Sequence, residues 1–232
     1  MAKKPEILHE QRVVRYDAMH WKRLAGLRER GREVLGKLEG AGIHVLAHGS
    51  IARGDVSDAS DVDIVVPYLV PSFEIDLAVG SGIRREIVQA TPSSVMKGHI
   101  HLDQRTVVSF PLIRMMTRES DFYRWGGVVD AAQLDRNERV AGVDKRLILI
   151  EPTENGHIES GVVGYEYIVA KKIGVSVDIA KERVRVLLRR DQIGRTGVYL
   201  DRVLSEEESF EAVLETLQDR NPAIRRTIEK RR

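Results

Sequence analysis

The chain has 232 residues, of which 31% are charged, and its formal net charge is +2 at pH 7. This near balance excludes a polycation, and the lack of cysteine excludes disulfides and thiolate metal sites. Because no apolar run approaches the roughly 18 residues of a membrane span and the opening Met-Ala-Lys-Lys-Pro is not a signal peptide, we expect a cytoplasmic protein without membrane contact.

The first predicted element is a long helix. Apolar positions form one stripe over residues 16–38, and the Gly-Ala-Gly of residues 40–42 ends it. A short apolar strand, residues 43–47, follows and leads directly into Gly49-Ser50. The amides and the hydroxyl of such a turn suit the terminal phosphates of a nucleotide.

Two aspartates alternate with apolar residues in the next predicted strand, residues 60–66. Alternation places Asp61 and Asp63 on one face of the strand, while Val62 and Ile64 point to the other. Two neighbouring carboxylates repel each other unless a cation lies between them, and hard oxygen ligands select Mg²⁺ or Mn²⁺. A divalent-metal site beside a phosphate-binding turn is typical of nucleotidyl transfer.

This combination resembles the active-site signature of the DNA polymerase β-like nucleotidyltransferase superfamily. The matching residues are Gly49-Ser50, Ala52-Arg53-Gly54 and Ser60-Asp61-Val62-Asp63, within a segment of about residues 43 to 110. The resemblance implies that Gly49 and Ser50 bind an NTP and that Asp61 and Asp63 hold Mg²⁺ or Mn²⁺. Arg53 is a further candidate phosphate contact, or equally a surface arginine paired with Asp55 or Asp58. The alternative for the acidic residues is a solvated turn or a weak Ca²⁺ loop, which would need neither the Gly-Ser turn nor the apolar alternation.

The resemblance also implies a third carboxylate on a later strand. Residues 95–102 and 106–112 are predicted to form a hairpin with Asp103 near its turn, forty positions beyond Asp63. We predict Asp103 as the third metal ligand and catalytic carboxylate. The alternatives are that Asp103 is a turn aspartate and that Ser109 occupies the family position.

Residues 73–89 carry apolar side chains near helical spacing and predict a helix. The aromatic segment at residues 122–125 could stack on a base or acceptor, or form a small core cluster. A predicted strand at residues 147–150 precedes a Pro- and Gly-containing break at residues 152–156. We therefore predict an α+β fold in two parts: a polymerase β-like nucleotidyltransferase domain, residues 1–150, with a mixed sheet and flanking helices, and a small second domain, residues 151–232.

The second domain resembles a winged helix-turn-helix. Two helices, residues 165–173 and from Ser176 to about residue 190, are separated by a turn at Gly174, and residues 193–200 could form a wing. Between residues 171 and 202, nine basic residues against four acidic ones give a net charge of +5. The predicted nucleic-acid contacts are Lys181, Arg185, Arg189 and Arg195. Protein contact is the alternative, because winged helices are frequently protein interfaces and acidic residues weaken the positive field.

Two functions follow from these motifs. In the first, the chain is a metal-dependent nucleotidyltransferase whose winged helix presents an acceptor, with a nucleic acid as the expected partner. In the second, it is a DNA-binding transcriptional regulator whose nucleotidyltransferase domain senses a nucleotide or has lost catalysis. The complete Gly-Ser and Asp-x-Asp motifs favour the first.

Overall fold

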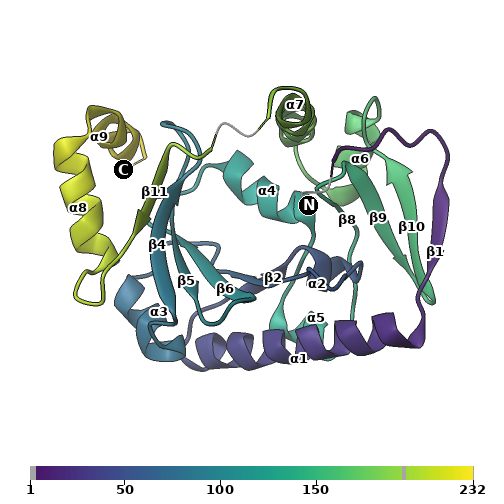
Figure 1. Ribbon diagram of the computed structural model, residues 1–232, viewed down its shortest axis with the longest axis horizontal. Helices are drawn as coiled ribbons and strands as arrows, with labels where there is room; N and C mark the ends of the chain where they lie inside the picture. The colour runs from purple at the N-terminus through teal and green to yellow at the C-terminus, as the bar shows by residue number, and fades with distance from the viewer. Residues whose placement is uncertain (1–3, 195–196, 232) are drawn as a thin grey trace.

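The computed structural model describes residues 4–194 and 197–231. Its larger sheet is mixed and has seven strands (Figure 1). In spatial order they are β11 (Leu200–Val203), β4 (Arg84–Gln89), β5 (Met96–His101), β6 (Thr106–Pro111), β3 (Val62–Val65), β2 (Leu46–His48) and β7 (Val128–Val129). The strands β3 and β6 are parallel, and their other neighbours are antiparallel. This strand order places residues that are far apart in sequence on the same face of the sheet.

One face of this sheet carries the main hydrophobic core. Even-numbered strand residues such as Ile64, Ile100 and Phe110 are fully buried there and pack in one cluster with residues of the covering helices. These helices are α1 (Ala18–Gly40), α3 (Ser72–Val79), α5 (Ala131–Asp135), α8 (Phe210–Arg220) and α9 (Pro222–Glu229). The helix α1 begins at Asp17, whose side chain caps the His20 amide at 2.7 Å.

The other face carries the odd-numbered residues of β3, β5 and β6. It is approached by α2 (Ser50–Arg53), α4 (Thr117–Gly126) and, beyond α4, α7 (Val177–Ile193) (Figure 1). The side chains on this face include Asp63, His99 and Ser109, which are polar. The polar face is therefore the one on which a site can form.

A second, smaller sheet lies beside the first (Figure 1). Its order is β1 (Arg12–Arg15), β10 (Gly156–Gly161), β9 (Ile148–Thr153) and β8 (Gly142–Val143), all antiparallel. The helices α6 (Glu166–Ile173) and α7 pack with β8 and β9 in a second core that also includes Trp125 of α4. The aromatic segment at residues 122–125 therefore contributes to a core.

The elements divide differently from the two predicted domains. The predicted boundary at residue 150 falls within β9, and β1 pairs with β10, so the N-terminal strand belongs to the second sheet. The predicted helix over residues 73–89 ends at Gly80, where φ is +83°, and β4 begins at Arg84. Short apolar runs fit the helix period and the strand period equally well. Here the second half of the run forms a strand because it pairs with β5.

The segment predicted as a wing takes another path. Residues 195–196, which include Arg195, lie outside the described residues. The strand β11 pairs with β4 of the larger sheet, and α8 then places Phe210 against Phe110 with ring centroids 4.9 Å apart. The predicted helix pair itself is present as α6 and α7, with Gly174 in a left-handed conformation between them. In the part of the chain that the structure describes, no helix is both long and apolar enough to cross a membrane.

Candidate functional site

The Gly49-Ser50 turn lies where β2 ends and α2 begins, and we refer to it below as the phosphate-binding turn. Gly49 has a φ of +79°, a conformation that residues with a Cβ adopt at a cost. Its amide donates to the Gly127 carbonyl at 2.9 Å. Within the ranges 4–194 and 197–231, the Ser50 and Ile51 amides and the Ser50 hydroxyl make no hydrogen bond, so they are available to phosphate oxygens.

Arg28 of α1 supports this turn from the core side. Its guanidinium is buried and donates to the carbonyls of Ile51 at 2.9 Å, Ala52 at 3.2 Å and Glu138 at 2.8 Å. The last carbonyls of a helix lack partners within the helix. Arg28 supplies these partners for α2, and burial lowers its pKa to about 10.

Asp61 and Asp63 lie at the beginning of β3, as the alternation predicts. Asp61 is exposed and Asp63 is half-buried. A Cβ added to Gly49 would lie 3.9 Å from Asp63 Oδ2, so this carboxylate faces the phosphate-binding turn. Burial raises the pKa of Asp63, the charge of Lys145 lowers it, and the charge of Asp61 raises it. Asp61 and Asp63 offer hard carboxylate oxygens, and Asp63 is partly removed from water. Such a pair fits Mg²⁺ or Mn²⁺.

Lys145 is a site residue that no sequence motif indicates. It lies in the turn between β8 and β9, where the Asp144 carboxylate accepts two backbone hydrogen bonds at 2.8 and 3.2 Å. Leu147, in the same turn, has a φ of +63°, which is strained for a residue with a Cβ. The exposed Lys145 side chain carries the charge that lowers the pKa of both Asp63 and His48. Nothing local in the sequence shows that this turn reaches β3.

Arg53 is bound within the protein. Its guanidinium donates two hydrogen bonds to the Asp55 carboxylate, at 2.9 and 3.0 Å, and a third to the Gly126 carbonyl. The sequence suggests a phosphate, Asp55 or Asp58 as the partner of Arg53, and the structure contains the pair with Asp55. Arg53 thereby connects α2 to the last residue of α4.

Asp103 is held on the side of the hairpin that faces α1. Its carboxylate accepts from Arg30 of α1 at 3.0 Å and from the Arg105 amide at 2.8 Å. The neighbour of Asp63 on β6 is Val107. The structure therefore does not bring Asp103 beside Asp63, and its place in the hairpin turn accounts for the backbone bond.

Ser109 lies on the polar face, two residues beyond Val107 on β6. Its hydroxyl is 2.8 Å from His99 Nδ1, and burial lowers the pKa of His99 to about 4. Among the residues described, no three His, Asp or Glu side chains are arranged to hold a metal ion. The described residues therefore offer Asp61 and Asp63 as a pair of candidate ligands, without a third carboxylate beside them.

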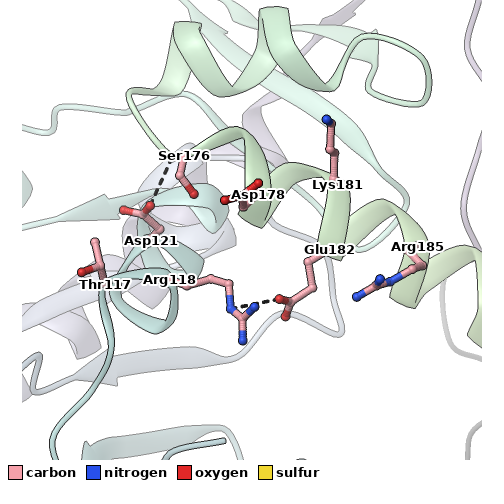
Figure 2. Close-up of a pocket in the computed structure, with 8 residues that line it drawn as sticks. All are labelled: Thr117, Arg118, Asp121, Ser176, Asp178, Lys181, Glu182 and Arg185. Carbon is pink, nitrogen blue, oxygen red and sulfur yellow. Dashed lines mark hydrogen bonds and ion pairs between the residues drawn. The ribbon is translucent and has the colours of Figure 1, made fainter.

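Lys181 and Arg185 line a groove of about 530 Å³ between α4 and α7 (Figure 2). Arg118 extends from α4 to Glu182 of α7, at 3.1 Å, and Figure 2 shows Lys181 and Arg185 leaving α7 in different directions. The groove also contains three carboxylates, those of Asp121, Asp178 and Glu182. It is therefore mixed in charge. Arg189 is exposed further along α7.

Comparison with known families gives one finding. Residues 28–110 match the family model described as "Nucleotidyltransferase domain". The matched segment runs from within α1 to β6 and includes the phosphate-binding turn, Asp61 and Asp63. Neither the curated proteins nor the solved structures contain a match to this chain.

Proposed function

We propose that this protein is a divalent-metal-dependent nucleotidyltransferase that transfers a nucleoside monophosphate from an NTP to an acceptor hydroxyl. The observation that carries the proposal is the position of Asp63, whose Oδ2 lies 3.9 Å from the place that a Cβ on Gly49 would take. A carboxylate pair and a phosphate-binding turn are thus adjacent within the segment that matches a nucleotidyltransferase domain. Phosphoryl transfer depends on this combination of positioning and charge stabilisation.

The NTP phosphates bind at the phosphate-binding turn. The Ser50 and Ile51 amides and the Ser50 hydroxyl donate to the phosphate oxygens, and Gly49 allows their close approach. Lys145 contributes a positive charge that also lowers the pKa of Asp63. Arg53 contributes indirectly, because its bonds to Asp55 and Gly126 hold α2 in place.

Asp61 and Asp63 would hold the metal ion beside the phosphate-binding turn. When bound, Mg²⁺ or Mn²⁺ neutralises charge on the leaving pyrophosphate and makes the acceptor hydroxyl more acidic. The acceptor oxygen forms a bond to the α-phosphorus while the bond to pyrophosphate breaks, and the hydroxyl proton passes to water. Asp103 takes no part in these steps and stays bound to Arg30.

The test is calorimetric titration of ATP, GTP, CTP and UTP, with and without Mg²⁺. Wild type is expected to bind at least one NTP in a metal-dependent way, and Asp61→Asn/Asp63→Asn to lose affinity by roughly two orders of magnitude. The control is Asp58→Asn, because Asp58 is an exposed acid of the same loop. It should bind as wild type does.

Thermal unfolding separates loss of binding from loss of the fold. Because burial disfavours the ionised form of Asp63, Asp63→Asn should keep or raise the melting temperature without metal. Transfer from α-labelled NTP then identifies the acceptor. Equal NTP binding in the double variant would refute the proposal, and metal-independent duplex DNA binding with no NTP binding would favour the regulator.

A further inference from the structure

Two half-buried cations, Lys97 on the polar face of the sheet and Arg183 on α7, are not among the site residues described above. Lys97 Nζ is 4.4 Å from the Tyr123 ring centroid and 5.4 Å from that of Phe122. The Arg183 guanidinium of α7 is 5.0 Å from the Phe122 centroid. Residues of β5, α4 and α7 thus meet at one place, which we call the cation cluster.

Neither cation is neutralised by an ion pair. In the described ranges, no carboxylate lies within ion-pair distance of Lys97 or Arg183. The acid whose charge most affects Lys97 is Glu119, and it already accepts hydrogen bonds from Arg231 at 2.6 and 2.8 Å. Burial lowers the pKa of Lys97 to about 8 and also lowers that of Arg183. Desolvated cations without a counter-ion are costly unless a ligand supplies one.

The rings of Phe122 and Tyr123 position the two cations. Because the cations occupy the ring faces, little ring surface is left for stacking of a nucleotide base. Phe122 has Lys97 and Arg183 within contact range, and Tyr123 lies between Lys97 and His48. Cation–π contacts hold ammonium and guanidinium groups without neutralising them. The cluster therefore keeps its positive charge available to an anion.

The cation cluster lies across Asp63 from the phosphate-binding turn. The strand β2, which ends at that turn, flanks β3 on one side, while β6 and then β5 follow on the other. Lys97 pairs with Pro111, four residues beyond the Val107 that pairs with Asp63. With strands about 4.8 Å apart and a rise of about 3.3 Å per residue, the Cα atoms of Lys97 and Asp63 are roughly 16 Å apart. The two backbones are therefore well separated, although the Lys97 charge still acts on His48 beside the phosphate-binding turn, so the test below must separate strand binding from NTP binding.

The positive charge continues along α7. Arg190 lies two helical turns beyond Arg183, on the same side of the helix. It is exposed, and its charge contributes to the lowered pKa of Arg183. A row of separated cations matches a chain of phosphates better than it matches one phosphate group.

We propose that Lys97 and Arg183 bind backbone phosphates of a single-stranded nucleic acid whose terminal hydroxyl is the acceptor at Asp61 and Asp63. This inference rests on the proposed function and assigns its acceptor class. The strand passes Arg183 of α7 and Lys97 of β5 beside Phe122 of α4, and its end is directed toward Asp63. The groove lined by Lys181 and Arg185 is not needed for this path.

The test uses a single strand of about ten nucleotides and measures its affinity across a salt series. Lys97→Met/Arg183→Met removes both charges and keeps apolar contacts with the rings. The variant should bind the strand at least about tenfold more weakly, and the slope of log K against log salt should fall by about 1.4, the loss of two phosphate contacts. Its affinity for NTP with Mg²⁺ should stay that of wild type.

The matched control is Arg124→Met/Lys171→Met, which removes an exposed arginine of α4 and an exposed lysine of α6. It should leave strand affinity near that of wild type. If Lys97 and Arg183 only stabilise packing, their variant will unfold at lower temperature and bind the strand normally. Loss of NTP binding in that variant would instead assign the cluster to the triphosphate. Either result overturns the inference.

A second measurement needs no substitution. In wild type with ¹³C-methylated lysines, the NMR signal of Lys97 should shift when the strand is added and stay in place with NTP and Mg²⁺ alone. An unchanged signal at saturating strand would refute the inference. Wild type that binds NTP at Asp61 and Asp63 but no single strand would also refute it, while leaving the proposed function in place.

Discussion

His48, directly before the phosphate-binding turn, is held uncharged by its surroundings. Its Nε2 is buried without a hydrogen-bond partner among the described residues, and a Cβ on Gly126 would lie 2.3 Å from that atom. Burial lowers the pKa of His48 to about 3, and the charges of Arg53, Lys97 and Lys145 act in the same direction. The ring therefore fills space between β2 and α4 and is unsuited to proton transfer at neutral pH.

Protonation of His48 predicts a loss of stability in mild acid. In the unfolded chain its pKa returns to 6.5, so the unfolded state binds more protons and stability falls as the pH drops below 6.5 towards 3. Between pH 6.5 and pH 5 the loss from this residue is about 2 kcal/mol. His48→Phe should remove most of this loss of stability. Urea unfolding at several values between pH 6.5 and pH 5 measures the difference. His44→Phe, at an exposed position, is the control, and an unchanged pH dependence in His48→Phe would contradict the assignment.

The sequence indicates individual site residues where the motif is local. Asp61, Asp63 and the phosphate-binding turn lie within fifteen positions of one another, so alternation and spacing suffice to place them together. Lys145 and Lys97 carry no such signal, because each comes from a different strand or turn and reaches the site through the fold. Asp103 has a plausible spacing, but spacing does not specify the side of the hairpin on which a side chain lies.

At the scale of elements, α2 depends on one buried arginine. Because Arg28 donates to three carbonyls, Arg28→Met would leave those of Ile51 and Glu138 without partners, while that of Ala52 keeps the Val140 amide, and should reduce the free energy of unfolding by about 3 kcal/mol. The same change should weaken NTP binding, because the phosphate-binding turn begins α2. Urea unfolding and calorimetry on one preparation measure both effects.

Arg23 provides the comparison. It pairs with Asp58, whose side chain is 90% exposed, so Arg23→Met should cost less than about 1 kcal/mol. Similar losses in the two variants would show that the buried carbonyl contacts are not what stabilises α2.

Elements with a strong period are the ones that the sequence predicts. The stripe over residues 16–38 corresponds to α1, and the Ser176 cap corresponds to the start of α7. Residues 73–89 fail because Gly80 and Gly82 interrupt a run whose second half pairs as β4. Similarly, β11 is only four residues long. It pairs with β4, which lies more than a hundred positions earlier, so no local pattern predicts it.

At the scale of the molecule, neither sheet is made from one contiguous stretch of the chain. The strand β1 needs β10, and β4 needs β11. Phe210, Val213, Ile224 and Ile228 of α8 and α9 belong to the main core. We therefore predict that a fragment of residues 1–150 does not fold by itself, as it would if it were an independent domain.

The measurement is a comparison of the fragment with the full chain by circular dichroism and limited proteolysis. The fragment should lack a cooperative thermal transition and should be cleaved within the core strands. Phe210→Ala in the full chain isolates one contact and should cost about 3–5 kcal/mol, since the ring is fully buried. A cooperatively folded fragment would show instead that the C-terminal helices are dispensable.

The late arrival of β11 also governs how this protein is made on the ribosome. Synthesis proceeds at roughly 5–20 residues per second, so β4 has emerged for several seconds before residues 200–203 can pair with it. During that interval β4 is an open edge, the kind of strand that recruits other chains into aggregates. Nascent chains should therefore engage chaperones until β11 has been translated, and slow codons before β11 should lower the yield of soluble protein.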